Sequence, residues 1–263
     1  MKNPIFFRPE VIPEEGTEEF EDALDALVEW LEGAGVEVVD SESPEPEPNE
    51  PRRDCMAEET LKNPLTDQFT KALTLACDLH QTQPRKGTQI PYMCHILGVA
   101  SLALEYGATE AEAIAAILHD AIEDQPRGDA TRAQIRELGG EVLAIVEGCT
   151  QDKSLADGTE ASWMLQREAY IKKLPSASSS IRLVSACDKL HNARAVLADY
   201  RVHGEALWTR FNGKRKTLWY YRALADAYAA AESTPSPLVA ELNRVVRKLE
   251  KLAAAAHRPG EPA

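Results

Sequence analysis

Residues 119–124 bring one imidazole and three carboxylates together on a short stretch of chain. His119 is followed directly by Asp120, and Glu123 and Asp124 come four residues after His119 and Asp120 respectively. Residues four apart share one face of a helix, so this segment would present two candidate metal ligands and, one turn later, two more carboxylates. The apolar run at 113–118 leads straight into it. Because ionisable groups beside a buried helix cost free energy unless a metal or hydrogen bonds pair them, we expect a functional site here.

Two other clusters could complete a metal site with this segment. Asp188 and Asn192 are one turn apart on one side of a helix with an apolar face, and His95 stands early in an upstream helix. With His119 and Asp120, they would supply two imidazole nitrogens and two carboxylates. That donor set suits a divalent transition ion and leaves positions open for water and substrate.

Helices must position these groups, because helical periodicity dominates the chain from Leu65 onward. Thr109 is a good cap for the helix that carries His119, and Pro126 and Gly128 are expected to end that helix. No alternating strand series, internal repeat or Gly-rich phosphate loop follows residue 60. The main body is therefore predicted to be all-α. Further helices are predicted near 67–81, 92–106, 130–138, 140–149, 160–174, 178–201, 204–210, 215–232 and 236–256.

Other conspicuous residues have structural interpretations. The aromatic triplet Trp219-Tyr220-Tyr221 is expected in the hydrophobic core. His191 should point away from the side of its helix that carries Asp188 and Asn192, so we expect a buried hydrogen-bonding residue rather than a ligand. Lys153 offers one more candidate cation for a phosphate group.

The N-terminal part of the chain differs from the rest in composition. Residues 1–40 predict a small acidic α/β-like unit, with apolar residues at helical spacing from Phe20 to Leu31 and a short strand at 36–39. Residues 41–60 are rich in Pro and Glu, which predicts an extended linker. The main domain is expected at 61–256, and 257–263 should form a frayed tail.

Charge is concentrated in the same N-terminal part. The 263-residue chain carries a formal net charge of −14, but residues 1–60 hold 19 acidic and 4 basic side chains. The rest is nearly neutral, so the overall acidity does not argue against an anionic substrate. The sequence contains no apolar run of about 20 residues and no secretory signal, and its five cysteines form no Cys-x-x-Cys pair. A cytoplasmic protein with free thiols is expected.

The order and spacing of four motifs carry a family resemblance. They resemble the hydrolase domain of RelA/SpoT-type alarmone enzymes, and also the stand-alone small alarmone hydrolases, within the HD-domain phosphohydrolases. The resemblance covers about residues 65–230. A His-Asp pair alone is a weak signal, but the ordered set is specific. In chain order the motifs are Arg85-Lys86-Gly87, His95, His119-Asp120-x-x-Glu123-Asp124 and Asp188-x-Leu190-His191-Asn192.

This resemblance implies a multi-helix HD-domain bundle with a metal centre. Glu123 and Asp124 would orient and activate the attacking water, since carboxylates outside the metal's own shell can take its proton. One Mn²⁺ per chain would be held by four side chains, namely His95, His119, Asp120 and Asp188.

The resemblance also implies which residues bind the substrate. Arg85 and Lys86 would bind the nucleotide, with Arg85 stacking on the base, because a guanidinium is planar and always charged. Asn192 would contact the ribose-phosphate region, assisted by Arg194.

The implied reaction removes pyrophosphate from the 3′ position of ppGpp or pppGpp, leaving GDP or GTP. One alternative is a related HD phosphohydrolase acting on another nucleotide, such as ppApp or a phosphorylated dinucleotide. A second is a non-catalytic HD-fold nucleotide-binding regulator. The expected partner is a small-molecule nucleotide, with neither nucleic acid nor membrane. Base preference, oligomeric state (including a homo-oligomer), the role of residues 1–60 and the identity of the divalent metal stay open.

Overall fold

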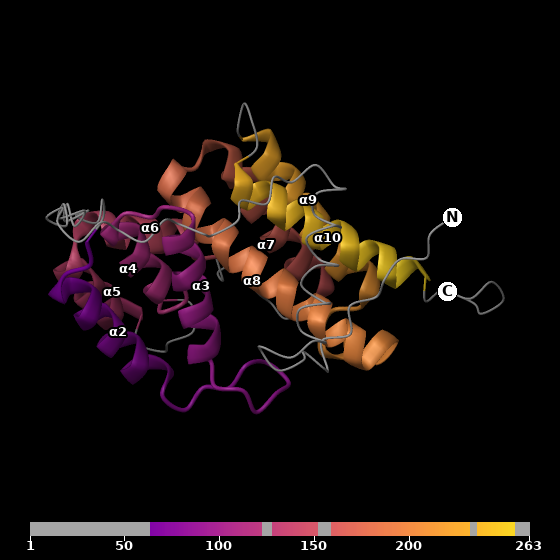
Figure 1. The fold of residues 1–263 in the computed structure, drawn as a ribbon, viewed down its shortest axis with the longest axis horizontal. Helices are drawn as coiled ribbons and strands as arrows, with labels where there is room; N and C mark the ends of the chain where they lie inside the picture. Colours follow the sequence, from indigo (N-terminus) through magenta and orange to yellow (C-terminus); the bar gives the residue numbers. More distant parts are fainter. Residues whose placement is uncertain (1–63, 123–127, 152–158, 232–235, 256–263) are drawn as a thin grey trace, which may run out of the picture. The chain divides into compact units, whose positions relative to one another are not determined.

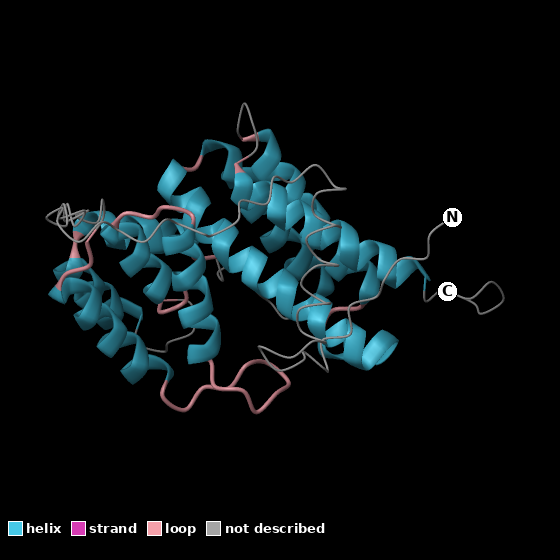
Figure 2. Cartoon of the chain, in the orientation of Figure 1, coloured by secondary structure: helices cyan, strands magenta, loops and turns pink. Residues whose placement is uncertain are grey.

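The structure, a computed structural model, describes residues 64–122, 128–151, 159–231 and 236–255 (Figure 1). These residues form helices joined by short loops, and their only β feature is a single bridge between Pro84 and Pro91 (Figure 2). The predicted all-α fold of the main body is therefore confirmed. The predicted unit at 1–40, the linker at 41–60 and the tail at 257–263 lie outside the described residues.

Eleven helical segments, two of them 3₁₀, follow one another in the described part of the chain. The loop at 82–92 between the first two is the longest connection whose residues are all described. The segments are α2 (Asp67–His80), α3 (Met93–Glu105), α4 (Glu110–Leu118), α5 (Gly128–Leu138), α6 (Gly140–Cys149), α7 (Glu160–Lys173), η2 (Leu174–Ser176), α8 (Ser179–His203), η3 (Gly204–Arg210), α9 (Lys214–Ala230) and α10 (Pro237–Ala255).

The start of α4 follows the predicted cap. The Thr109 side chain accepts a hydrogen bond from the Glu112 backbone N–H, and the Glu112 carboxylate accepts one from the Thr109 backbone N–H at 2.8 Å. This reciprocal capping box satisfies two of the donors that a helix N-terminus leaves unpaired. It fixes where α4 begins, and therefore where its other end delivers His119.

The predicted end of this helix is wrong. Helix α4 ends at Leu118, residues 119–122 form turns, and Gly128 begins α5 rather than ending α4. Locally, the Ala121 N–H donates to the Leu118 carbonyl at 2.9 Å, while Nδ1 of His119 lies 2.8 Å from the Ala116 carbonyl. These three-residue contacts replace the four-residue helical ladder. The helix predicted at 204–210 is present, but as a 3₁₀ helix, η3.

Helix α4 lies at the centre of the hydrophobic core. Every residue from Ala113 to Leu118 is buried, so the helix has no solvent-facing side, as expected for a helix that is apolar all round. It packs against α2, α3, α6 and α8, and its alanines allow close approach. A central helix of this kind can place a polar side chain in the interior only at its end.

Helix α8 connects the two groups of helices seen in Figure 1. It packs against α3, α4 and α6 on one side and against α9 and α10 on the other. Helix α10 buries a stripe of apolar residues with a spacing of three and four, which is the pattern of an amphipathic helix. The middle of α8 is therefore buried from several directions, and Asp188 lies in that buried stretch.

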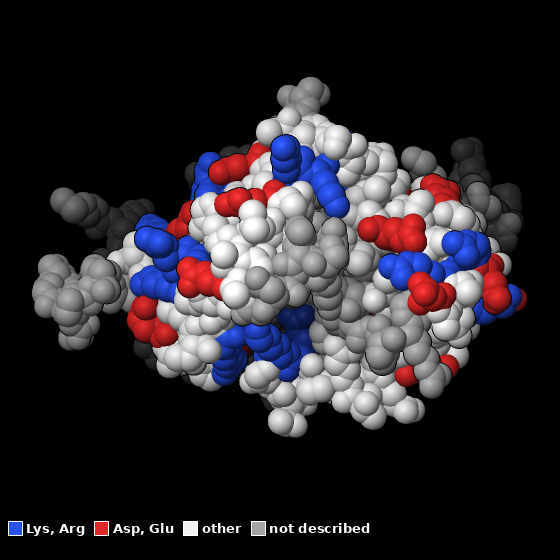
Figure 3. Space-filling view, turned by 180° about the vertical axis from the view of Figure 1, so that it is seen from behind, with Lys and Arg blue, Asp and Glu red and all other residues white. Residues whose placement is uncertain are grey.

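The surface of the described residues mixes both signs of charge. In the view of Figure 3, basic and acidic side chains lie next to one another in separate clusters, and one basic group borders a recess near the centre. None of the described helices is both long enough and apolar enough to cross a bilayer.

Candidate metal centre and substrate cavity

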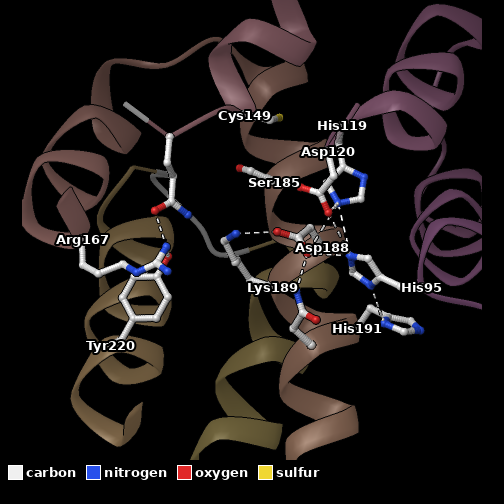
Figure 4. Close-up of polar contacts among 12 residues, drawn as sticks. His95, His119, Asp120, Cys149, Arg167, Ser185, Asp188, Lys189, His191 and Tyr220 are labelled. Atoms are coloured by element: carbon white, nitrogen blue, oxygen red, sulfur yellow. Dashed lines mark hydrogen bonds and ion pairs between the residues drawn. The ribbon is translucent and has the colours of Figure 1, made fainter. Parts of the chain in front are cut away.

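Four side chains from three parts of the chain meet at one buried point (Figure 4). His95 comes from the first turn of α3, His119 and Asp120 from the turn that follows α4, and Asp188 from the middle of α8. The Nε2 atoms of the two histidines are 3.2 Å apart. Asp120 Oδ2 lies 3.0 Å from His119 Nε2 and 3.6 Å from His95 Nε2. Asp188 Oδ1 completes the group.

Both imidazole rings are held so that Nε2 faces this point. Asp188 Oδ1 lies 3.2 Å from Nε2 of His95 and 3.7 Å from Nε2 of His119. The opposite ring nitrogens have partners elsewhere: Nδ1 of His119 lies 2.8 Å from the Ala116 carbonyl, and Nδ1 of His95 lies 2.9 Å from Nδ1 of His191. A hydrogen bond at one ring nitrogen fixes which nitrogen is left to bind a metal.

The electrostatics of the group are those of a site that holds a cation. Burial disfavours the charged form of His119, yet the Asp120 carboxylate beside it raises the pKa of His119 well above its usual range. Burial also opposes ionisation of Asp120 and Asp188, but His119 and Lys189 respectively hold the pKa of each carboxyl well below its usual range. Without a metal, the raised pKa of His119 favours a protonated imidazole there, whose positive charge stabilises the two carboxylates.

The donor set and its spacing fit a single divalent transition ion. Donor atoms about 2.0–2.2 Å from one ion lie roughly 3 to 3.5 Å from each other. The described residues give distances of 3.0, 3.2, 3.2, 3.6 and 3.7 Å among the imidazole nitrogens and carboxylate oxygens. The ligand atoms of three of these residues, His95, His119 and Asp120, all lie within 4.8 Å of one another. Nitrogen and oxygen donors together suit a transition ion better than calcium or magnesium.

Each carboxylate is also fixed from outside the group. The Tyr92 hydroxyl donates to Asp120 Oδ2 at 2.6 Å. Asp188 accepts hydrogen bonds from the side chains of Lys189, at Oδ2, and Asn192, at Oδ1. These partners leave each carboxylate little freedom to rotate, and such outer contacts tune metal affinity.

Arg85 contacts both Asn192 and Tyr92, which hold the carboxylates of Asp188 and Asp120 respectively. Its Nη2 donates to Oδ1 of Asn192 at 2.9 Å, and its guanidinium carbon lies 5.9 Å from the centre of the Tyr92 ring. The loop that carries it is closed by the hydrogen bond from the Arg85 N–H to the Ile90 carbonyl at 2.8 Å. Arg85 is therefore linked to Asp188 through Asn192 and to Asp120 through Tyr92.

His191 is the hydrogen-bonding residue that the sequence predicts, although it is partly rather than fully buried. It occupies a notch that Gly98 creates on α3. A Cβ atom at Gly98 would lie only 2.3 Å from Nε2 and 2.4 Å from Cδ2 of the His191 ring. Only a residue without a side chain leaves room for this imidazole beside His95.

A cavity of about 390 Å³ opens beside the four-residue group. This volume lies in the range of small-molecule sites. Asp120, Asp188, Asn192 and Lys86 line it on one side. Its remaining lining residues are Tyr92, Cys149, Gln151, Trp163, Arg167, Lys189, Phe211, Asn212, Thr217, Tyr220 and Tyr221.

The remaining predicted site residues fall in different places. Arg194 lies apart from the cavity: it is half exposed, and its Nη2 donates to Glu241 on α10 at 3.0 Å. Glu123 and Asp124 lie outside the described residues, as does Lys153.

One wall of the cavity is built from side chains that belong to none of the sequence motifs. Tyr220, predicted in the core, packs against it half-buried and also lines the cavity, as does its buried neighbour Tyr221. Trp163 and Arg167 stand beside it, and their four-residue separation on one predicted helix was the only available signal. Lys189 also lines the cavity and pairs with Asp188.

The chain resembles known proteins over the part that builds this centre. The family model described as "HD domain" matches residues 72–219. A GTP pyrophosphokinase of Myxococcus xanthus is 34% identical over 138 residues, which are 51% of this chain and 18% of that protein. The guanosine-3′,5′-bis(diphosphate) 3′-pyrophosphohydrolase MESH1 of Homo sapiens is 33% identical over 131 residues, which are 48% of this chain and 68% of MESH1. The match thus covers under a fifth of the bacterial enzyme and two thirds of MESH1.

Solved structures agree on the fold. A structure titled "A metazoan ortholog of SpoT hydrolyzes ppGpp and plays a role in starvation responses" superposes with a TM-score of 0.56 at 23% identity, covering 71% of this chain and 97% of the other. A structure from Listeria monocytogenes EGD-e gives a TM-score of 0.52 at 26% identity, covering 60% of this chain and 99% of the other. From the family match and these relatives, the chain belongs to the HD-domain family, and its relatives within that family are of the RelA/SpoT type.

Proposed function

We propose that this protein is a metal-dependent 3′-pyrophosphohydrolase that converts ppGpp or pppGpp to GDP or GTP and pyrophosphate. The observation that carries the proposal is the convergence of His95, His119, Asp120 and Asp188 beside a cavity of nucleotide size. The relatives point the same way: MESH1 is named for this reaction, and the chain covers 68% of its length.

In this proposal the four converging side chains hold one divalent ion, and Mn²⁺ is the ion that the family resemblance favours. Such an ion supplies Lewis acidity, which acidifies water and neutralises charge that develops on phosphate oxygens. The two imidazoles would bind through Nε2, because their Nδ1 atoms are engaged with Ala116 and His191.

The protein's own groups would orient the reactants. Lys86 at the cavity and Arg85 behind Asn192 would receive the nucleotide, with the Arg85 guanidinium stacking on the base. Asn192 would contact the ribose-phosphate region from the cavity wall. We assign the water-orienting and proton-accepting roles to Glu123 and Asp124 on sequence grounds.

The test is product identification with purified, Mn²⁺-loaded protein. Release of pyrophosphate and GDP from ppGpp, absent in a His119→Ala variant, is the expected result. Parallel assays with ppApp and a phosphorylated dinucleotide test the alternative that the protein is a related HD phosphohydrolase for another nucleotide. That enzyme would hydrolyse one of these substrates faster than ppGpp. Calorimetric binding of nucleotide without hydrolysis of any substrate would instead establish a non-catalytic binding module and overturn the proposal.

A further inference from the structure

The wall of the cavity formed by α7 and α9 holds a guanidinium against two aromatic rings, which meet edge to face. Trp163 and Arg167 lie one turn apart on α7, and Tyr220 comes from α9. The guanidinium carbon of Arg167 is 5.5 Å from the centre of the Trp163 ring and 4.8 Å from that of Tyr220. A planar cation stacked in this way is preorganised, and it loses little further freedom when it binds an anion.

Arg167 has spare hydrogen-bonding capacity. Its Nη1 donates to Oε1 of Gln151 and lies 3.5 Å from the Tyr220 hydroxyl. Its Nε is buried and has no hydrogen-bond partner among the described residues. None of the ion pairs between described residues involves Arg167; among these residues its partners are two aromatic rings, the Gln151 amide and the Tyr220 hydroxyl. A charged donor left unpaired in this manner is suited to an incoming anion.

Arg167 lines the same cavity as Asp120 and Asp188, two of the four candidate metal ligands. Figure 4 shows Arg167 and Tyr220 on one side and the histidines on the other, with Lys189 between them. Among the described cations that line the cavity, Lys189 is already paired with Asp188, and Lys86 is an exposed residue of the loop at 82–92. Of these three lining cations, Arg167 is the one that is partly buried and has no carboxylate partner among the residues that the structure describes.

The chemistry of the proposed substrate supplies the anion. A nucleoside 3′,5′-bis(diphosphate) carries two polyphosphate groups on different carbons of one ribose, so a site that places the 3′ group at the metal must accommodate the 5′ group elsewhere. We infer that Arg167, held against the rings of Trp163 and Tyr220, binds the 5′-phosphates and makes the enzyme selective for substrates that carry them. This inference rests on the function proposed above.

The direct test compares three substrates that differ only at the 5′ position. These are ppGpp, its 5′-monophosphate analogue and guanosine 3′-diphosphate with a free 5′-hydroxyl. The wild-type protein should prefer the 5′-diphosphate. Arg167→Gln should lower kcat/KM for ppGpp about tenfold or more, mainly through KM, because a charge-assisted hydrogen bond to phosphate is lost. The same variant should leave kcat/KM for the 5′-hydroxyl substrate nearly unchanged. Arg167→Lys, which keeps the charge, should fall in between.

The ratio of two kcat/KM values from one preparation does not depend on how much of that preparation is folded. Equal losses on all three substrates would therefore assign Arg167 a structural role and overturn the inference. Arg136→Gln, an exposed arginine on α5, is the matched control and should preserve the wild-type preference.

A binding measurement keeps this test separate from the proposed reaction. Calorimetry with GDP and with guanosine, on Mn²⁺-loaded protein, reports the contribution of the 5′-phosphates without turnover. Tighter binding of GDP in the wild type, lost in Arg167→Gln, supports the inference even if ppGpp is not hydrolysed. Equal affinities for GDP and guanosine in the wild type would contradict it, whatever the activity.

Discussion

Nδ1 of His191 lies 2.9 Å from Nδ1 of His95. This contact is on the side of the His95 ring opposite to Nε2, the atom that faces the other candidate metal ligands. If Nε2 of His95 binds the metal, its Nδ1 carries the hydrogen and donates it to His191. The sequence separation between these residues is 96 positions, so the contact exists only because α3 packs against α8.

We predict that His191→Ala lowers Mn²⁺ affinity by about 10- to 100-fold, because an outer hydrogen bond that orients a ligand imidazole is removed. Titration calorimetry on the metal-free protein measures the change. His191→Gln, which retains an acceptor, should recover part of the loss. His203→Ala, an exposed histidine at the end of the same helix, is the control. Unchanged affinity in His191→Ala would show that His95 needs no such support.

Gly98→Ala should damage the metal centre from a distance. The new Cβ would lie 2.3 Å from Nε2 of His191, so the imidazole must move, at a cost of about 1–3 kcal/mol in unfolding free energy. Mn²⁺ affinity should fall as well. Chemical denaturation and calorimetry measure the two effects.

The matched control is Gly140→Ala in the first turn of α6, where nothing lies within 4 Å of an added Cβ. That substitution should be neutral or stabilising by up to about 1 kcal/mol. In a His191→Ala background, Gly98→Ala should cost much less. A full cost in that background would mean that Gly98 matters for another reason.

Asp188→Asn should abolish metal binding and also weaken the fold. The substitution removes the counter-charge of Lys189, which is buried and stays charged because Asp188 raises its pKa despite desolvation. Leaving one charge of a buried pair alone costs about 3–5 kcal/mol. Adding Lys189→Met to Asp188→Asn should restore much of the melting temperature but not the metal. Asp199→Asn, on a more exposed turn of α8, is the control. Retained metal in Asp188→Asn would exclude Asp188 as a ligand.

Mn²⁺ affinity should depend on pH through His119. Its pKa is raised in the metal-free protein, so the imidazole keeps its proton to a higher pH than a free histidine does. The metal must displace that proton, and affinity should therefore rise with pH until it passes the raised pKa, then level off. The pKa values of Asp120 and Asp188 are lowered, so both carboxylates stay ionised over this range.

The stability of the metal-free protein should show the opposite trend. A raised folded-state pKa contributes stability below the unfolded pKa of about 6.5, and this contribution is lost as the pH rises through the folded value. The melting temperature measured in a chelator should fall over that interval, and saturating Mn²⁺ should remove the fall. A melting temperature independent of pH would contradict the assignment to His119.

Glu123→Gln should retain Mn²⁺ and slow turnover, because the amide cannot take a proton from water. A loss of about 10²- to 10⁴-fold in kcat is expected if Glu123 is the general base. Metal analysis and steady-state kinetics on one preparation separate the two effects. Unchanged kcat would assign the proton to another group.

Local signals in the sequence sufficed for most of the helices. The capping pair Thr109 and Glu112, the apolar run at 113–118 and the spacing of α10 each express a rule that acts within one or two turns. The end of α4 does not follow from these local rules: beyond Leu118 the chain forms turns, and Nδ1 of His119 lies 2.8 Å from the Ala116 carbonyl. Periodicity cannot reveal that choice.

The candidate site divides in the same way. Sequence motifs predict the four candidate metal ligands, but the residues that contact these ligands depend on how the helices pack. Tyr92 meets Asp120 across 28 positions, and Arg85 meets Asn192 across 107. An aromatic residue in a helical stripe usually packs in the core, and this general pattern predicts no cavity-facing role for Tyr220. Only the arrangement of α7 against α9 turns it toward the cavity.

Arg85 donates a hydrogen bond to Asn192, and Asn192 donates one to Asp188, so under the proposed function metal and nucleotide would be mutually dependent ligands. A nucleotide that draws Arg85 away would alter the amide that holds the Asp188 carboxylate. Thermodynamic reciprocity then requires that the factor by which nucleotide changes the metal's dissociation constant equals the factor by which metal changes the nucleotide's. If the proposed site holds a divalent ion, the concentration of that ion would shift the nucleotide concentration at which the cavity fills.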